Sequence, residues 1–404
     1  MIKRFWVQNF CSIGEMQEIS LAISGKDALD TSSIPSGGPK KEYLNLVSCI
    51  IGENASGKTA FLKAITFLFW FITTAYKESD PTQPIPFDPH ALWEGHNSIL
   101  GIEFYYKGQL HRFEIEFNDS EIVHEIYSIK KTTKMMTVFE LTRNKKNNVK
   151  LLGNIKLNKG DSDRFIHNRS NLPLMSALID TAYLKDFKFF RQIYSNVTRA
   201  GYRGPQRGVA FAVSQTLSKD IDLRSPALTF LRDIDIGVDD FSFETVEVKN
   251  TQGEISPVDV LVFNHTTQKG KFDLNIFDES NGTQQALFIF VKISPILQEG
   301  GIVFLDEIDG GLHPDIVRKL IYLFENRKTN PNGAQIIFTT HQHLLLNDRT
   351  KTQIFITEKD SGSLESNLSR LDEFEGIRND DNYFHKYISG TYGGVPHINW
   401  DGSR

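Results

Sequence analysis

The sequence feature that most constrains this chain is a glycine-rich octapeptide between two apolar segments. Residues 52–59 read GENASGKT, which fits the pattern G-x-x-x-x-G-K-[ST]. The β-branched run at residues 46–51 predicts a buried strand before it, and the apolar run at residues 60–76 predicts a helix after it. A strand, a glycine-rich loop and a helix in this order form a phosphate-binding loop, so the chain is expected to bind a nucleotide.

Each residue of the octapeptide has a physical role in that loop. Gly52 and Gly57 allow backbone conformations and a close approach that a Cβ would block. The backbone N–H groups and the helix N-terminus form a cradle for the α- and β-phosphates of ATP. Lys58 is expected to reach the β- and γ-phosphates, and the Thr59 hydroxyl is expected to ligate Mg²⁺. The predicted nucleotide-binding residues are Gly52, Glu53, Asn54, Ala55, Ser56, Gly57, Lys58 and Thr59.

Two acidic residues follow a second apolar strand pattern. Residues 301–305 read GIVFL and are followed by Asp306 and Glu307. Because ligands bind at the carboxyl ends of parallel strands, both carboxylates are expected beside the phosphate-binding loop. Asp306 is predicted to hold Mg²⁺, directly or through water, and Glu307 to orient and deprotonate the attacking water.

Two further segments carry polar residues at the ends of predicted elements. His341 follows the apolar strand pattern at residues 334–340, a position from which it would contact a γ-phosphate. Ser280 is a good N-cap residue before a helical pattern, and the N-terminus of such a helix attracts an anion. His341 is therefore predicted as a catalytic residue together with Lys58 and Glu307.

Four motifs in this order resemble those of the ABC-type AAA family ATPases of the OLD-like group, similar to ATPase subunits of bacterial anti-phage defence systems. The motifs are residues 52–59, 279–285, 302–314 and 339–347. The resemblance implies ATP and Mg²⁺ as cofactors and a homo-oligomer, a dimer or larger, with composite ATP sites. In such sites the signature segment of one subunit closes the site of another. Here that segment would contribute Ser280, Asn281, Gly282, Thr283 and Gln284.

The expected fold is an α/β ABC-type core with a β-rich and helical insertion. The core is expected from residues 1–78 and 272–404, a β-rich subdomain from 79–160, and a helical or mixed insertion from 161–271. Residues 99–117 alternate as a hairpin with a turn at Lys107 and Gly108, and residues 123–142 continue as a second hairpin. Residues 170–197 are expected to be helical. A Q-loop residue is expected within residues 84–93.

The expected function is an ATP-hydrolysing clamp or sensor that holds and releases a toxic effector. The partner would be an effector protein encoded nearby, with a nuclease among the candidates. The alternative is a DNA-handling ATPase similar to repair and recombination clamps. A net charge of −5 does not indicate nucleic-acid binding. The basic cluster Arg143, Lys145, Lys146 and Lys150 is expected to be a solvated hairpin tip rather than a phosphate contact.

Several classes of protein are excluded by what the sequence lacks. The two cysteines cannot form a disulfide framework or a four-cysteine zinc site, and no signal peptide is visible, so a cytoplasmic protein is expected. Residues 60–76 are predicted as a buried core helix rather than a membrane span. The sequence has neither a sustained heptad repeat nor a CxxC motif between Thr59 and Ser280. It is therefore not expected to be a chromosome or repair ATPase with long coiled-coil arms. The residues after His341 are expected to be too few for the Toprim nuclease domain of OLD proteins. The separation of Thr59 from Ser280 is longer than a compact transporter ATPase needs, which disfavours a transporter subunit.

Overall fold

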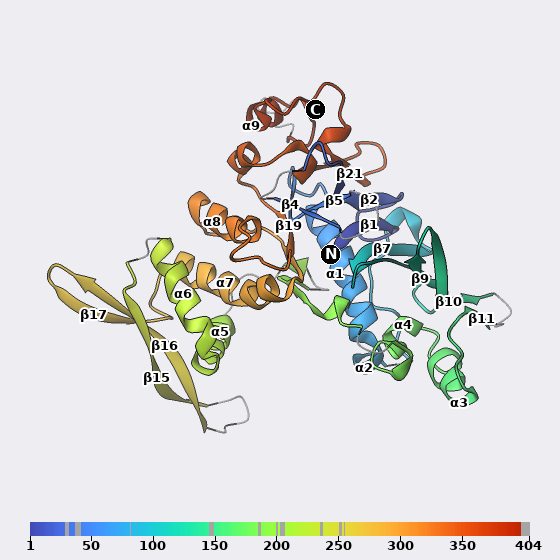
Figure 1. Cartoon of the computed structure of the whole chain (residues 1–404), viewed down its shortest axis with the longest axis horizontal. Coiled ribbons are helices and arrows are strands. Elements are labelled where there is room, and N and C mark those ends of the chain that lie inside the picture. Colours follow the sequence, from blue (N-terminus) through green and yellow to red (C-terminus); the bar gives the residue numbers. More distant parts are fainter. Residues whose placement is uncertain are drawn as a thin grey trace.

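The structure is a computed structural model that describes most of the chain. The described residues are 1–28, 32–36, 42–80, 82–144, 149–184, 187–198, 201–202, 207–234, 237–249, 253 and 255–396. Figure 1 shows one long central helix, α1 (Lys58–Thr73), with a sheet on either side of it, and a smaller sheet that projects from the body. Within the described part of the chain, no helix has both the length and the apolar character needed to cross a bilayer.

The sheet that carries the predicted site has six strands. Their spatial order is β12 (Ile193–Ser195), β18 (Ile302–Leu305), β19 (Gln335–Thr339), β6 (Val47–Gly52), β20 (Ile354–Lys359) and β21 (Ser366–Arg370). The first five strands pair in parallel and β21 is antiparallel. Every residue of β6, β18 and β19 is buried, as expected for strands that are covered on both faces. Their carboxyl ends therefore lie at one edge of the sheet.

Two helical layers cover this parallel sheet. On one face α1 packs against alternate strand residues such as Ile50, Phe304 and Ile337. On the other face α7 (Asn281–Glu299) and α8 (Pro314–Glu325) pack against residues such as Val47 and Leu305. The alternation follows from the two-residue period of a strand. The prediction that residues 60–76 form a buried core helix is confirmed.

The second large sheet is antiparallel and has seven strands. Their order is β11 (Val149–Gly153), β10 (Lys134–Arg143), β9 (Ile122–Lys131), β8 (Gln109–Phe117), β7 (Ser98–Tyr106), β1 (Ile2–Gln8) and β2 (Gln17–Ser20). Both predicted hairpins are confirmed. Lys107 and Gly108 have φ angles of 49° and 74°, so both residues of the tight turn are left-handed, as a two-residue hairpin requires. Strand β1 lies within residues 1–78, which were expected to belong to the core. It pairs with β7, which lies within residues 79–160, the expected β-rich subdomain.

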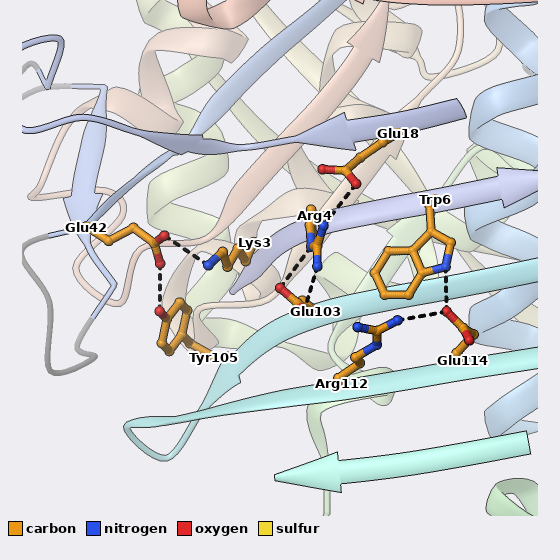
Figure 2. A network of polar contacts seen from close by, with 9 residues as sticks. All are labelled: Lys3, Arg4, Trp6, Glu18, Glu42, Glu103, Tyr105, Arg112 and Glu114. Carbon is orange, nitrogen blue, oxygen red and sulfur yellow. Dashed lines mark hydrogen bonds and ion pairs between the residues drawn. The ribbon is translucent and has the colours of Figure 1, made fainter. Parts of the chain in front are cut away.

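A paired set of charges covers the outer face of this sheet (Figure 2). The Trp6 indole lies between the guanidinium groups of Arg4 and Arg112, at 5.2 and 5.0 Å from the ring centroid. The indole lies flat on Gly101, where a Cβ would come within 2.0 Å of the ring. Both arginines also pair with carboxylates, Arg4 with Glu103 and Arg112 with Glu114.

A third, three-stranded sheet extends away from the body in Figure 1. It comprises β15 (Asp240–Lys249), β16 (Ile255–Thr267) and β17 (Gly270–Asn275), with α5 (Arg207–Lys219) and α6 (Ile221–Asp233) beside it. The helices pack on α7: Phe230 of α6 stacks on Phe290 of α7 with ring centroids 4.5 Å apart. The projecting sheet is thereby tied to the α7 layer.

The expectation of a helix over residues 170–197 is largely wrong. Among the described residues of this segment, only α4 (Leu174–Leu178) and short 3₁₀ turns at Ala182–Leu184 and Phe189–Arg191 are helical, and strand β12 lies near its end. Its aromatic residues pack on the antiparallel sheet instead of along one helix face, with Phe189 stacked on Phe104 at 4.0 Å. Tertiary contacts override the local helical preference here.

The remaining strands and α-helices are short. They are β3 (Ala22–Ile23), β4 (Ser33–Pro35), β5 (Tyr43–Asn45), α2 (Ala75–Glu78), α3 (Lys159–Ser162), β13 (Val197–Thr198), β14 (Gly201–Tyr202) and α9 (Tyr383–Ile388).

Arg143, one of the four residues of the expected basic cluster, is not part of a solvated tip. Arg143 is buried and donates to the carbonyl oxygens of Ile122 and Ile166, each at 3.0 Å, so it holds the fold together. Lys150 is exposed, and Lys145 and Lys146 lie outside the described residues.

Candidate active site

The glycine-rich loop joins β6 to α1 and is anchored to β20. A Cβ at Gly52 would come within 2.3 Å of the Thr357 hydroxyl oxygen. Gly57 has a φ of 109° and caps α1, where left-handed backbone favours glycine. The Ser56 hydroxyl lies 2.6 Å from that of Thr357. Both glycines are therefore required by close contact or backbone conformation, as the sequence predicted.

Lys58 lies folded over this loop. Its Nζ donates to the carbonyl oxygens of Gly52 and Glu53, both at 2.8 Å, and the residue is 7% exposed. Burial lowers the pKa of the Lys58 ammonium, while the nearby carboxylates of Asp306 and Glu307 act in the opposite direction. The loop thus presents a partly desolvated cation at the N-terminus of a 16-residue helix.

Asp306, at the end of β18, is held by two threonine hydroxyls. Thr59 donates to Asp306 Oδ2 at 2.7 Å, and Thr339, at the end of β19, donates to Oδ1 at 2.6 Å. The structure thus brings the two predicted metal ligands, Thr59 and Asp306, into direct contact. Hydroxyl and carboxylate oxygens are the donors that Mg²⁺ prefers, and Mg²⁺ uses few protein ligands. The oxygen atoms of Thr59 and Asp306 are therefore of the kind that fits the expected ion.

A residue that the sequence did not single out fixes the backbone of Asp306. The Asn196 side chain follows β12, donates to the Asp306 carbonyl oxygen and accepts from the Asp306 N–H, each at 2.8 Å. Residues 84–93, where a Q-loop residue was expected, do not line the loop cavity; Asp88 pairs with Lys63 one turn further along α1. An asparagine after the short segment Ile193–Ser195 was the only signal for Asn196, and the helical expectation for residues 170–197 hid it.

Glu307 and His341 face each other beside Lys58. Glu307 has a φ of 49°, and its N–H donates to the Thr339 hydroxyl at 2.7 Å. Its carboxylate Oε1 lies 3.8 Å from His341 Nε2, and the two side chains are 45% and 41% exposed. The backbone is thus strained so that a hydrated carboxylate projects beyond the buried Asp306. A water molecule has access to both Glu307 and His341.

These groups line one cavity of about 260 Å³. Its lining residues are Ser12, Asn54, Ala55, Gly57, Lys58, Thr59, Ala60, Asp306, Glu307 and His341. The structure therefore assembles the loop, the acidic pair and the histidine from three strands, as the sequence predicted. Ser12 was not singled out; it lies in the loop after β1, where its hydroxyl accepts from Ser366 at 2.7 Å.

The predicted signature segment lies at the start of α7 and does not line this cavity. Ser280 caps the helix by accepting from the Thr283 N–H at 3.1 Å, which confirms the predicted N-cap. Gln284 donates from its amide to the Glu279 carbonyl oxygen at 2.8 Å. Ser280 and Asn281 are exposed, and Gly282 and Gln284 are half-buried. The segment is thus an ordered helix start that faces solvent.

The fold and the site together define an ABC-like P-loop ATPase of the AAA class. The match to a sequence family makes the assignment specific: residues 47–347 match the family described as "AAA domain, putative AbiEii toxin, Type IV TA system". This match spans most of the chain, and the chain belongs to that family. The predicted resemblance to AAA family ATPases with ABC-type motifs is confirmed. No curated protein gives a significant match to the sequence.

Solved structures of Smc head domains give distant matches. An SmcHead bound to the C-winged helix domain of ScpA has 14% identity and a TM-score of 0.43, and the match covers 93% of this chain and 99% of the other. An Smc head with an extended coiled coil, bound to a C-terminal domain of ScpA, from Pyrococcus furiosus, has 12% identity and a TM-score of 0.41, with 92% and 97% covered. An Smc head from Pyrococcus yayanosii has 10% identity and a TM-score of 0.42, with 96% and 99% covered.

Proposed function

We propose that this chain binds ATP with Mg²⁺ and hydrolyses it at a site that a second copy completes. The observation that carries the proposal is the chain of contacts from Thr59 through Asp306 to Thr339, with Glu307 and His341 beside Lys58. This arrangement combines a phosphate cradle, an oxygen set for a hard cation and a solvent-accessible base.

The protein's own groups have separate roles in this proposal. The loop N–H groups and Lys58 hold the phosphate chain, because a partly desolvated ammonium binds phosphate oxygens strongly. Thr59 and Asp306 hold Mg²⁺, which when bound offsets the negative charge that develops on the phosphate oxygens. Glu307 orients a water and accepts its proton, and His341 lies where it can contact the γ-phosphate.

The placement of the signature segment supports a composite site. The N-terminus of α7 is an anion site with exposed Ser280 and Asn281, but the cavity of the same chain is built without it. A γ-phosphate in the cavity of a second copy would be its ligand. A symmetric dimer then satisfies two such sites at once, and we propose a dimer or a larger assembly on this ground.

We further propose that ATP turnover controls the hold on an effector protein in anti-phage defence, in the cytoplasm. The family description, which names a toxin of a toxin–antitoxin system, supports a role beside a toxic activity. The described residues contain no cluster of three or more histidine, cysteine or acidic side chains that would hold a metal ion for a nuclease. The destructive chemistry is therefore assigned to the partner, for which a nuclease encoded nearby is the candidate.

The charge pattern disfavours the DNA-handling alternative. Phosphate-backbone binding needs lysine and arginine side chains that are free to release counterions. On the outer face of the antiparallel sheet, Lys3, Arg4 and Arg112 are each paired with a glutamate (Figure 2). Arg143 is committed to two carbonyl oxygens.

A mixing experiment tests the composite site. Gly282→Asp places a negative charge where a γ-phosphate would bind and is expected to abolish ATP hydrolysis but not ATP binding. Lys58→Ala removes the cradle cation. Each variant alone should be inactive, and mixing them should restore part of the ATPase activity, because one of the two sites in a heterodimer is intact. A heterodimer of wild type with Lys58→Ala is the control, because it shows whether a single intact site is sufficient for hydrolysis. If that control is active and the mixed variants form heterodimers without recovering activity, the trans arrangement is contradicted.

A further inference from the structure

A buried histidine–glutamate pair lies directly before the signature segment. His265 of β16 places Nε2 at 2.7 Å from Oε1 of Glu279, and the two side chains are 9% and 7% exposed. Glu279 precedes Ser280, the residue that caps α7. None of the roles described above uses either side chain.

Glu279 contacts the signature segment at two points. Its carboxylate Oε2 accepts from the Ser280 N–H at 3.2 Å, and its carbonyl oxygen accepts from the Gln284 amide at 2.8 Å. Its own N–H donates to the carbonyl oxygen of Asn275, the last residue of β17, at 3.2 Å. The position of Glu279 therefore sets where the exposed start of α7 lies.

His265 in turn fixes Glu279 from the projecting sheet. Its Nδ1 donates to the Gly237 carbonyl oxygen at 2.8 Å, because a carbonyl oxygen can only accept. A second proton must then lie between Nε2 and Oε1, since two lone pairs would repel at that distance. The ring is also stacked on Phe272 of β17, with centroids 4.9 Å apart and planes 8° from parallel. The imidazole is thus held in one orientation by three contacts.

We infer that His265 is a positioning residue for the trans ATP site. It holds Glu279, and through it Ser280 and Gln284, in the arrangement that a partner's γ-phosphate requires. The β15–β17 sheet and the signature segment are thereby tied together, since α5 packs on both β16 and α7, and the His265–Glu279 pair joins β16 to the start of α7. This inference rests on the composite site proposed above. It adds a coupling between the projecting sheet (Figure 1) and ATP hydrolysis.

The test variant is His265→Phe, which retains a flat ring against Phe272 and removes both hydrogen bonds. We expect kcat for ATP hydrolysis to fall about ten- to a hundred-fold, the effect of losing one charge-assisted hydrogen bond. ATP affinity should not change, because the cradle of the same chain is intact. His124→Phe is the matched control: His124 pairs with Glu140 at 3.1 Å on the antiparallel sheet, far along the chain from α7. Its kcat should equal that of the wild type.

Mixing distinguishes positioning of the signature from general damage. A heterodimer of His265→Phe with Lys58→Ala has one site with an intact cradle and an intact signature, so activity should partly recover. If His265→Phe does not fold, Glu279→Ala, which leaves no unpaired carboxylate, takes its place with the same expected recovery.

Two results overturn the inference and leave the composite site standing. The first is an unchanged kcat in the folded variant. The second is a loss that mixing does not restore, while the Gly282→Asp and Lys58→Ala pair does recover. If neither pair recovers, the composite site itself is refuted and the coupling is refuted with it.

Discussion

Replacing Asn196 with alanine should separate the role of this side chain in catalysis from its role in stability. The side chain is the partner of both backbone groups of Asp306, each at 2.8 Å, and Asp306 is 1% exposed. Asn196→Ala leaves a buried N–H and a buried C=O without these partners. Such orphaned groups cost about 1–3 kcal/mol each, so we expect the free energy of unfolding to fall by about 2–6 kcal/mol.

The matched control for this prediction is Asn171→Ala. Asn171 is 5% exposed, and its amide donates to the carbonyl oxygens of Asp80 and Gln83 at 3.2 and 2.8 Å, away from the cavity. Urea unfolding should show a loss of similar size for both variants. Steady-state ATP hydrolysis by the folded proteins should show a fall in kcat for Asn196→Ala alone, about tenfold, because Asp306 is no longer held. A kcat for Asn196→Ala equal to that of the control would refute the positioning argument.

Three further perturbations have defined outcomes. Lys58→Ala should abolish ATP binding measured by calorimetry while the circular dichroism spectrum is unchanged; unchanged affinity would refute the cradle. Burial raises the pKa of Glu125 to about 7, so its stabilising contribution is present at acidic pH and is lost as the pH rises through 7. In the wild type the free energy of unfolding should fall by at most about 3 kcal/mol between pH 5 and 8 because of Glu125. Glu125→Gln should remove this pH dependence, as measured by urea unfolding. Gly101→Ala should displace the Trp6 indole, which would lie 2.0 Å from the added Cβ, and cost about 1–3 kcal/mol in thermal unfolding.

The elements that the sequence predicted well are those with a complete local signal. The strand before Gly52 and the helix after Thr59 follow from apolar runs on either side of a loop with fixed glycine positions. The hairpin turn at Lys107 and Gly108 follows from strict alternation and one glycine. In each case the residues that decide the structure are neighbours in the chain, so spacing alone is sufficient.

The features that were missed depend on contacts between distant segments. Thr339 holds Asp306 because β18 and β19 are paired in register, with Phe304 opposite Ile337. Asn196 reaches Asp306 only because β12 adds to the edge of the parallel sheet beside β18. The aromatic residues around Phe189 gave a helical pattern, whereas their packing on Phe104 decides the fold of that segment. Pairing of this kind is not encoded in the local pattern of one strand.

ATP-dependent assembly and hydrolysis are best tested by measuring the mass and nucleotide content of Glu307→Gln in ATP and Mg²⁺. The amide is nearly isosteric with the carboxylate but cannot accept the proton of the attacking water. Light scattering should show an assembly of twice the monomer mass or more that retains ATP, whereas Lys58→Ala stays unassembled under the same conditions. Hydrolysis of ATP by Glu307→Gln at the wild-type rate would rule out Glu307 as the base, and ATP binding by a monomeric Glu307→Gln would rule out the composite site.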